Sequence, residues 1–426
     1  MRTPRTGLFM LLALTLGGFT AGQLALGDDL PDDTQQALGQ PWPIHVIDNG
    51  SRGADGVRLA DVDGDGRMDI TTGWEEGGIT RVYLHPGNDK AAQPWPAVTV
   101  GKTPSVEDAV FVDLDADGHT DVVSCCEGGT RTMFVHWAPK DPQDYLDAKA
   151  WKTEPIAASK GAMMWMFCLP MQIDGRHGVD LVAGAKGGGA KIGWFEAPEA
   201  PRRLDQWRWH PICDAGWIMS LRADDVDRDG DLDVVTTDRR GELRGCRWLE
   251  NPGSVGEQRQ PWTNHFVGGR DHECMFMTMA DLDADGADDM LVAARPDHLV
   301  LFQRRQGIAP SWQQTMLRLP ENTGGSKGVA IGPIDADKQP DVVFSCEGAS
   351  GTKSGVMWLS YDKSPTEQTW TAHALSGPVG IKFDRIELLD IDSDGDLDVL
   401  CCEESEPVDG KRHGLGVFWY ENPTTR

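Results

Sequence analysis

Aspartates at a regular spacing are the residues of this chain best suited to chemistry. Residues 60–73 read ADVDGDGRMDITTG, in which four aspartates stand two, two and four positions apart around a glycine. Carboxylates this close repel one another unless a cation or protons neutralise them. Calcium takes about six to eight oxygen ligands, and alternate positions of a tight loop can point several carboxylates at one centre, while glycine permits the sharp turn. The stretch therefore predicts a calcium-binding loop.

The aspartate stretch is a repeat. Copies begin at residues 61, 113, 172, 225, 281, 333 and 390, which gives a period of 52 to 59 residues. A period of this length is typical of propellers and other repeat architectures. Five copies keep every carboxylate, and in the first the carbonyl of Arg67 would add a further ligand. These five copies predict five Ca²⁺ sites, with the ligands Asp61, Asp63, Asp65, Asp69, Asp113, Asp115, Asp117, Asp121, Asp225, Asp227, Asp229, Asp233, Asp281, Asp283, Asp285, Asp289, Asp390, Asp392, Asp394 and Asp398.

Two copies of the repeat are eroded. The third, QIDGRHGVD, keeps only Asp174 and Asp180, and an arginine takes the place of its third aspartate. The sixth, PIDADKQPD, has Lys338 where the other copies have glycine. We expect these two loops to bind calcium weakly or not at all.

Other interpretations of the aspartates fit less well. An EF-hand is excluded because its twelfth position would be Thr72 rather than glutamate, and because strands rather than helices flank the loop. An Asx-turn hairpin without metal and carboxylate acid catalysis both remain open for any single copy. Five intact copies favour calcium over both.

Strand-like segments surround every copy of the repeat. In the first unit GVRLADV precedes the aspartates and DITTGW follows them, and long amphipathic helices are not apparent. A WFEAP- or WYENP-type segment and a tryptophan-initiated segment complete each unit, and four of the latter carry histidine three residues after the tryptophan, at His45, His210, His265 and His373. We expect these histidines to pack across strands rather than to bind metal.

Seven units of four strands predict an all-β fold, a seven-bladed β-propeller. The chain begins its repeats at a WxxH segment and ends them at the WYENP segment that should pair with it. The N- and C-terminal strands would then share the last blade and close the ring. An open β-solenoid, the main alternative, gives no reason for this offset.

The repeat resembles a known family. Its D-x-D-x-D-G-x-x-D copies, in phase with the FxEN-type strands, are similar to the VCBS/FG-GAP repeats, whose best-known propellers form the heads of integrin α-chains. The resemblance covers roughly residues 42 to 423. It implies the propeller fold and calcium binding, and says little of activity, because the family includes adhesins, carbohydrate-binding proteins and some enzymes. The literal Phe-Gly and Gly-Ala-Pro signatures are absent, which places the chain with the aspartate-rich repeats.

The N-terminus has the features of an export signal. Arg2 and Arg5 precede an apolar run over residues 8–16 that is short for a membrane span, so residues 1–27 predict a cleaved signal peptide. Residues 28–41 form an acidic linker, residues 42–426 form the propeller, and no later segment predicts a transmembrane helix. We expect a secreted or periplasmic protein. Its formal net charge of −27 argues against nucleic acid as a partner.

Nine cysteines, an odd number, lie mostly in strand-like runs such as DVVSCC. They show neither CxxC pairs nor regular disulfide spacing, so buried thiols are favoured and any pairing stays open.

A candidate ligand site lies on the face opposite the calcium loops. The residue six positions past each final aspartate is charged in all seven units, basic in units three to five and acidic in the others. These candidate ligand-binding residues are Glu75, Glu127, Lys186, Arg239, Arg295, Glu347 and Glu404, with Trp165 and Trp217 beside them. The residues six positions before each copy divide in a related way: Asp55, Glu107, Met166, Met219, Met275, Lys327 and Asp384.

The favoured function is a binding module. Lys186, Arg239 and Arg295 would hold an anionic group of an acidic glycan or an extracellular protein partner, with an aromatic face beside it. The alternatives are a carbohydrate-active enzyme, a polysaccharide lyase or glycoside hydrolase using the glutamates, and an interaction scaffold whose loop charges are merely solvated. No catalytic residue is assigned, since no nucleophile elbow or HExxH motif is present. The oligomeric state stays open.

Overall fold

The computed structural model describes residues 37–305, 310–337, 339–366, 369–404 and 414–424. The chain separates into two units, Met1–Thr34 and Gln35–Arg426. The predicted signal peptide, residues 1–27, and most of the predicted linker lie outside the described residues. The described part contains no helix long and apolar enough to cross a bilayer.

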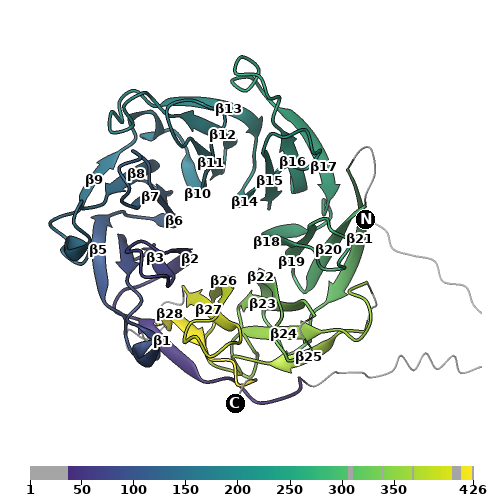
Figure 1. Ribbon diagram of the computed structural model, residues 1–426. Helices are drawn as coiled ribbons and strands as arrows, with labels where there is room; N and C mark the ends of the chain where they lie inside the picture. The colour runs from purple at the N-terminus through teal and green to yellow at the C-terminus, as the bar shows by residue number, and fades with distance from the viewer. Residues whose placement is uncertain (1–36, 306–309, 338, 367–368, 405–413, 425–426) are drawn as a thin grey trace, which may run out of the picture. The chain divides into compact units, whose positions relative to one another are not determined.

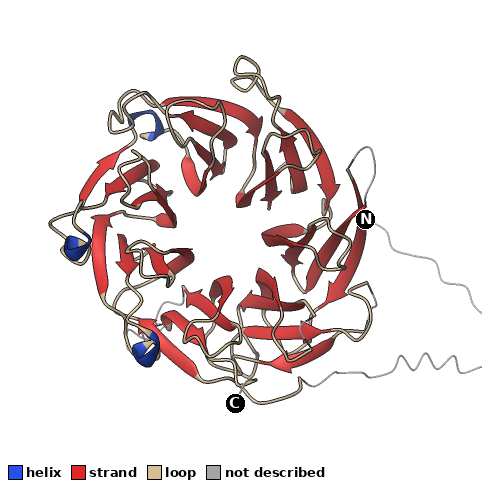
Figure 2. Cartoon of the chain, viewed as in Figure 1, coloured by secondary structure: helices blue, strands red, loops and turns tan. Residues whose placement is uncertain are grey.

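The second unit is built from strands, which form seven four-stranded antiparallel sheets (Figure 2). The innermost strands are β2 (Ala54–Ala60), β6 (Val106–Val112), β10 (Met164–Pro170), β14 (Ile218–Asp224), β18 (Glu273–Ala280), β22 (Gly325–Gly332) and β26 (Phe383–Leu389). The second strands are β3 (Asp69–Trp74), β7 (Asp121–Cys126), β11 (Leu181–Lys186), β15 (Asp233–Asp238), β19 (Asp289–Arg295), β23 (Asp341–Glu347) and β27 (Asp398–Glu403).

The outer half of each sheet is equally regular. The third strands are β4 (Ile79–Tyr83), β8 (Thr132–Trp137), β12 (Lys191–Glu196), β16 (Gly245–Glu250), β20 (His298–Arg305), β24 (Val356–Ser360) and β28 (Gly416–Tyr420). The outermost strands are β5 (Ala97–Lys102), β9 (Lys152–Pro155), β13 (Arg208–Asp214), β17 (Thr263–Gly268), β21 (Ser311–Arg318), β25 (Thr371–Ala374) and β1 (Ile44–Asp48). The described helices are short 3₁₀ turns, η1 (Asn88–Lys90), η2 (Pro142–Asp144) and η3 (Ala157–Ser159).

The seven sheets close into a ring, a seven-bladed β-propeller (Figure 1). Each innermost strand contacts the innermost strand of the next blade, and β26 contacts β2. The last sheet has the strand order β1-β28-β27-β26, so the first strand of the chain completes the last blade. This confirms the predicted closure and excludes the open solenoid.

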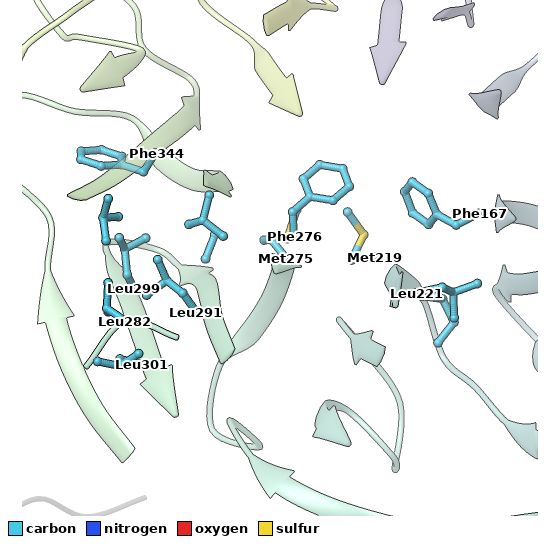
Figure 3. Packing of buried hydrophobic residues seen from close by; sticks show 14 of the residues in the cluster. Phe167, Met219, Leu221, Met275, Phe276, Leu282, Leu291, Leu299, Leu301 and Phe344 are labelled. Carbon is cyan, nitrogen blue, oxygen red and sulfur yellow. The ribbon is translucent and has the colours of Figure 1, made fainter. Parts of the chain in front are cut away.

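The core lies between neighbouring blades. All six residues of β3 and of β7 are buried, because each second strand is covered on both faces by adjacent blades. Figure 3 shows part of the largest buried cluster, in which Leu291 and Leu299 of blade five pack with Phe344 of blade six. All nine cysteines are free and eight are buried, as expected for thiols in such strands.

The histidines of the outermost strands have the structural role that the sequence predicts. His265 lies opposite Trp248 in the strand register, the two rings stack with centroids 4.0 Å apart, and the imidazole contacts Glu250 at 2.7 Å. His373 stacks on Trp358 in the same way, at 3.7 Å. These contacts tie the third strand to the outermost strand.

Candidate functional site

The aspartate loops connect the first and second strands of each blade. In the first loop Asp61 accepts hydrogen bonds from the backbone N–H groups of Gly64, Asp65 and Gly66. Gly64 and Gly66 have φ angles of 77° and 85°, in the left-handed region that favours glycine. The sixth position is a left-handed glycine in all five intact loops, while Lys338 of the eroded sixth copy lies outside the described residues.

The carboxylates of the intact loops have the chemistry of a hard-cation site. Ligand oxygens of Asp61, Asp63 and Asp69 lie within 4.8 Å of one another, as do those of the corresponding aspartates of the second loop. In the part of the chain that the structure describes, Asp115 and Asp283, both at the third position, each bury an Oδ1 atom without a hydrogen-bond donor. An anionic oxygen buried without a donor is costly. The orphaned oxygens and the oxygen-only donor set fit calcium.

The aspartate at the ninth position also accepts hydrogen bonds from backbone N–H groups. Asp69 is buried, and its two oxygens accept hydrogen bonds from the backbone N–H groups of Val62 at 2.9 Å and His85 at 2.8 Å. Burial raises the pKa of this carboxyl to about 7. Asp180 and Asp341 of the eroded copies keep the same bond to the second residue of their loops, at 2.9 and 3.0 Å. This aspartate therefore ties the loop to the sheet in copies that have lost the other carboxylates.

Arginines supply positive charge at several of the loops, and in the intact first loop Arg67 pairs with Asp65 at 2.7 Å. In the eroded third copy Arg176 occupies the place of the third aspartate and donates to Asp174 from Nε at 3.0 Å and Nη2 at 2.8 Å. Arg202 of blade three contacts the intact second loop, where it pairs with Asp115 and lies 3.3 Å from Asp117. A cation at the second loop would have to compete with this guanidinium.

The seven predicted charged residues lie at the ends of the second strands, and several of them contact one another across neighbouring blades. We call this ring of residues the mouth. On one side Lys186 pairs with Glu127 and lies 2.9 Å from Glu107. On the other side Arg295 pairs with Glu347, and Lys327 bridges Glu347 at 3.6 Å and Glu404 at 3.1 Å.

The acidic arc of the mouth runs over blades seven, one and two. Carboxylate oxygens of Asp55, Glu75 and Glu404 lie within 4.8 Å of one another, and Glu75 forms a second such group with Glu107 and Glu127. Burial and then the neighbouring carboxylates raise the pKa of Glu75 to about 7. Burial also raises the pKa of Glu107 to about 8, although Lys186 opposes this rise. The arc therefore holds protonated carboxyls near neutral pH.

A coupled pair of aspartates adds to this arc. Burial and then the charge of Asp384 raise the pKa of Asp55 well above its ordinary value. Burial acts in the same direction on Asp384, but the Lys327 ammonium, 3.5 Å away, outweighs it and lowers the pKa of that carboxyl. Within the pair Asp55 holds the proton and Asp384 carries the charge.

The basic arc is centred on Trp217. Lys186, Arg239 and Arg240 place their charged groups 4.6, 4.7 and 4.9 Å from the centroid of its ring. Arg239 and Arg240 share one carboxylate, Glu273, at 2.8 and 3.5 Å. The sequence analysis missed Arg240 and Glu273; the adjacency of Arg240 to Arg239 was a usable signal, whereas nothing in the sequence pointed to Glu273.

The prediction for Trp165 is wrong. Its side chain is 0 % exposed, and its indole N–H donates to the Ser159 carbonyl at 3.0 Å, so it belongs to the core and not to the mouth. A β-bulge between Trp165 and Phe167 shifts the register of β10, which reverses the expected alternation of side chains. Phe167 faces the channel instead and contacts Phe276, with ring centroids 5.7 Å apart (Figure 3).

No protein-family model matches the chain, and no curated protein matches it either. Among solved structures it is similar to the crystal structure of BBS1N in complex with ARL6DN soaked with mercury, with a TM-score of 0.49 and 11 % identity over 90 % of this chain and 98 % of that one. The same complex soaked with lead matches with a TM-score of 0.49 and 9 % identity, over 91 % of this chain and 99 % of that one.

Proposed function

We propose that this protein is an exported propeller of the VCBS/FG-GAP type, that bound calcium stabilises its fold, and that it acts as a binding module. It holds an anionic group of its ligand, an acidic glycan or an extracellular protein, on the basic arc of the mouth. The loops and the mouth lie at opposite ends of the innermost strands, so the metal sites stabilise the ring and the mouth recognises the ligand.

The calcium part rests on the donor chemistry of the five intact loops. Three carboxylates converge in each of the first, second and fourth loops, and buried third-position oxygens have no donor in the described part of the chain. In the third copy, which keeps only two of its aspartates, Arg176 brings a positive charge to Asp174. Because calcium binds the folded loops better than the unfolded chain, one site at a hundred times its Kd would stabilise the fold by about 2.7 kcal/mol.

One observation carries the ligand part: Arg239 and Arg240 stack on Trp217 and share a single carboxylate, Glu273. This arc therefore has a guanidinium in excess beside an aromatic surface. Guanidinium groups bind carboxylate, sulfate and phosphate in a planar, two-pronged geometry. Lys186, by contrast, already forms an ion pair with Glu127 and contacts Glu107, and it contributes less to an anion site.

The test combines retention with product analysis. Calcium-loaded protein is incubated with polygalacturonate, dextran sulfate and neutral dextran, retention on each is measured, and the soluble fraction is analysed by mass spectrometry. Retention on an acidic polymer without products supports the binding module. An Arg239→Gln/Arg240→Gln double variant should lose that retention, whereas an Arg203→Gln/Arg208→Gln double variant on the outer surface should keep it. Equal retention of both variants would place the ligand elsewhere.

A carbohydrate-active enzyme is the second candidate, and the acidic arc favours it. Glu75 and Glu107 lie in one carboxylate group and have pKa values of about 7 and about 8, where a carboxyl can donate or accept a proton. New oligosaccharides in the same incubation would support this candidate, and an unsaturated sugar end would indicate a lyase. A Glu107→Gln change should then abolish the products without abolishing retention.

A further inference from the structure

Three arginines lie along the channel below the mouth, one each on three innermost strands. Arg58 belongs to β2, Arg222 to β14 and Arg385 to β26. Figure 1 shows β14 across the centre of the ring from β2 and β26. Arg58 and Arg222 occupy equivalent register positions on their strands, and Arg385 stands two positions closer to the mouth.

Only two of these arginines have a carboxylate partner. Arg58 donates from Nε and Nη2 to the two oxygens of Asp108, both at 2.9 Å, and Arg385 donates from Nε to Glu387 at 2.7 Å. The side chain of Arg222 makes no ion pair or hydrogen bond with any residue that the structure describes, and it is only partly exposed. This section of the channel therefore carries one uncompensated positive charge.

The electrostatics agree with this contact pattern. Burial, and then the positive charges of Arg385 and Arg58, lower the pKa of Arg222 to about 10, while Glu387 acts in the opposite direction. Arg385 and Arg58 are thus close enough to act on the charge of Arg222. A guanidinium in this position is costly unless an anion compensates it.

The arginine section is separate from the mouth. Met219 lies at the level of the mouth, and Arg222, like Arg58, lies opposite the third residue of the neighbouring second strand, three residues further along β14. Arg385 stands two register positions closer to the mouth, at the level of Phe167, and donates to Glu387, which occupies the position equivalent to Arg222. At about 3.3 Å per residue, Arg222 lies ~10 Å from the first aspartate of its calcium loop, Asp225. The section therefore faces the loop end of the channel.

We propose that Arg222, Arg58 and Arg385 form a binding site for a small oxyanion, of the sulfate or phosphate class, reached from the calcium-loop end of the channel. The planar fork of each guanidinium suits such an anion, and Arg58 and Arg385 keep N–H groups beyond those used on Asp108 and Glu387. The competing explanation is that Arg222 only fills the channel and that water hydrates its charge. This proposal does not depend on the function of the mouth.

Thermal unfolding in sulfate tests the proposal. Wild type, Arg222→Gln and the outer-surface control Arg208→Gln are melted in calcium-containing buffer with increasing sulfate, with ionic strength held constant by NaCl. At ten times its Kd, sulfate should raise the Tm of wild type and of the control by about 2 °C. In an Arg239→Gln/Arg240→Gln background, which removes the proposed anion site of the mouth, adding Arg222→Gln should abolish the shift. In chloride alone Arg222→Gln should melt at or above wild type, because the substitution removes an unpaired charge.

Three outcomes would overturn the proposal. They are a wild-type Tm that sulfate does not move, an equal sulfate shift in Arg222→Gln, and an Arg222→Gln melt well below wild type in chloride with the sulfate shift retained. Should Arg222→Gln fail to fold, calorimetric titration of sulfate into Arg222→Lys replaces it, and the affinity should fall at least ~10-fold because the fork is lost. An Arg239→Gln/Arg240→Gln variant must keep the sulfate shift, which separates this site from the mouth.

Discussion

Arg176 occupies the position of the third aspartate of the intact loops, and its guanidinium donates hydrogen bonds to Asp174 from Nε at 3.0 Å and from Nη2 at 2.8 Å. This eroded repeat, which keeps two of its aspartates, thus has a positive charge that its own chain supplies. The same principle, that a remaining aspartate needs a compensating positive charge, is what calcium would satisfy in the five intact loops.

Removal of calcium should lower the melting temperature. With sites saturated at about a hundred times their Kd, each contributes ~2.7 kcal/mol, which corresponds to about 3 °C per site for a ring of this size. Differential scanning calorimetry with EDTA and after re-addition of Ca²⁺ measures the effect. An Asp174→Asn variant should show the same calcium dependence as wild type, because its loop is not counted among the sites. A melting temperature that EDTA does not change would exclude calcium as a stabilising ligand of the fold.

The ninth aspartate should matter without any metal. An Asp180→Asn change replaces an oxygen that accepts from the backbone of Ile173 or Ala197 with an N–H₂ donor, so two donors face each other. We expect a loss of about 1–3 kcal/mol in urea unfolding, equal with and without EDTA. A loss that vanished in EDTA would mean that Asp180 acts through a metal after all.

The acidic arc makes stability depend on pH. Glu75 and Glu107 have folded pKa values of about 7 and about 8, above the value of ~4.3 for an unfolded glutamate. The folded state therefore binds more protons than the unfolded chain between these limits, and the free energy of unfolding should fall as pH rises from about 4.3 to 8. Urea unfolding at pH 5.5, 7 and 8.5, with calcium saturating, measures this slope. Glu107→Gln should flatten it and the surface control Glu199→Gln should not; an equal slope in both variants would contradict the assignment.

Closure of the ring should depend on Trp419. This side chain is 1 % exposed, and the centroid of its ring lies 4.6 Å from that of His45 of β1. Its indole N–H donates to the carbonyl oxygen of Ala91 at 3.3 Å. A Trp419→Ala change should cost about 3–5 kcal/mol in the free energy of unfolding. Trp312→Ala, on the outermost strand of blade five, should cost clearly less because that side chain is partly exposed. Equal losses would show that the closing blade is no more sensitive than an outer strand.

The repeat made most of the fold predictable. Six of the seven second strands begin at the ninth aspartate, and β11 begins one residue after it, so one fixed offset from that residue reaches a similar height in all seven blades. For this reason the sequence predicts that the charged residues from Glu75 to Glu404 lie at the same end of the ring.

What the sequence did not reveal depends on local geometry and on pairing. The bulge after Trp165 turns that side chain into the core, and no residue type in MWMFCLP announces it. The contact between Lys186 and Glu107 joins two different blades, and the sequence does not give the distance between them. The hydrogen bonds of Asp69 to backbone amides likewise require three-dimensional placement, and a carboxylate in the sequence does not distinguish them from metal coordination.

The pairing of β1 with β28 also constrains the order of folding. Ile44 must meet Tyr420, and strands of the six other blades lie between these two residues in the chain. During synthesis β1 therefore has no partner strand until β28 has been made, and until then its backbone hydrogen-bonding groups stay unpaired. A search over so long a chain separation is slow. We infer that the pairing of β1 with β28 forms late, because β1 has no partner strand until β28 has been made.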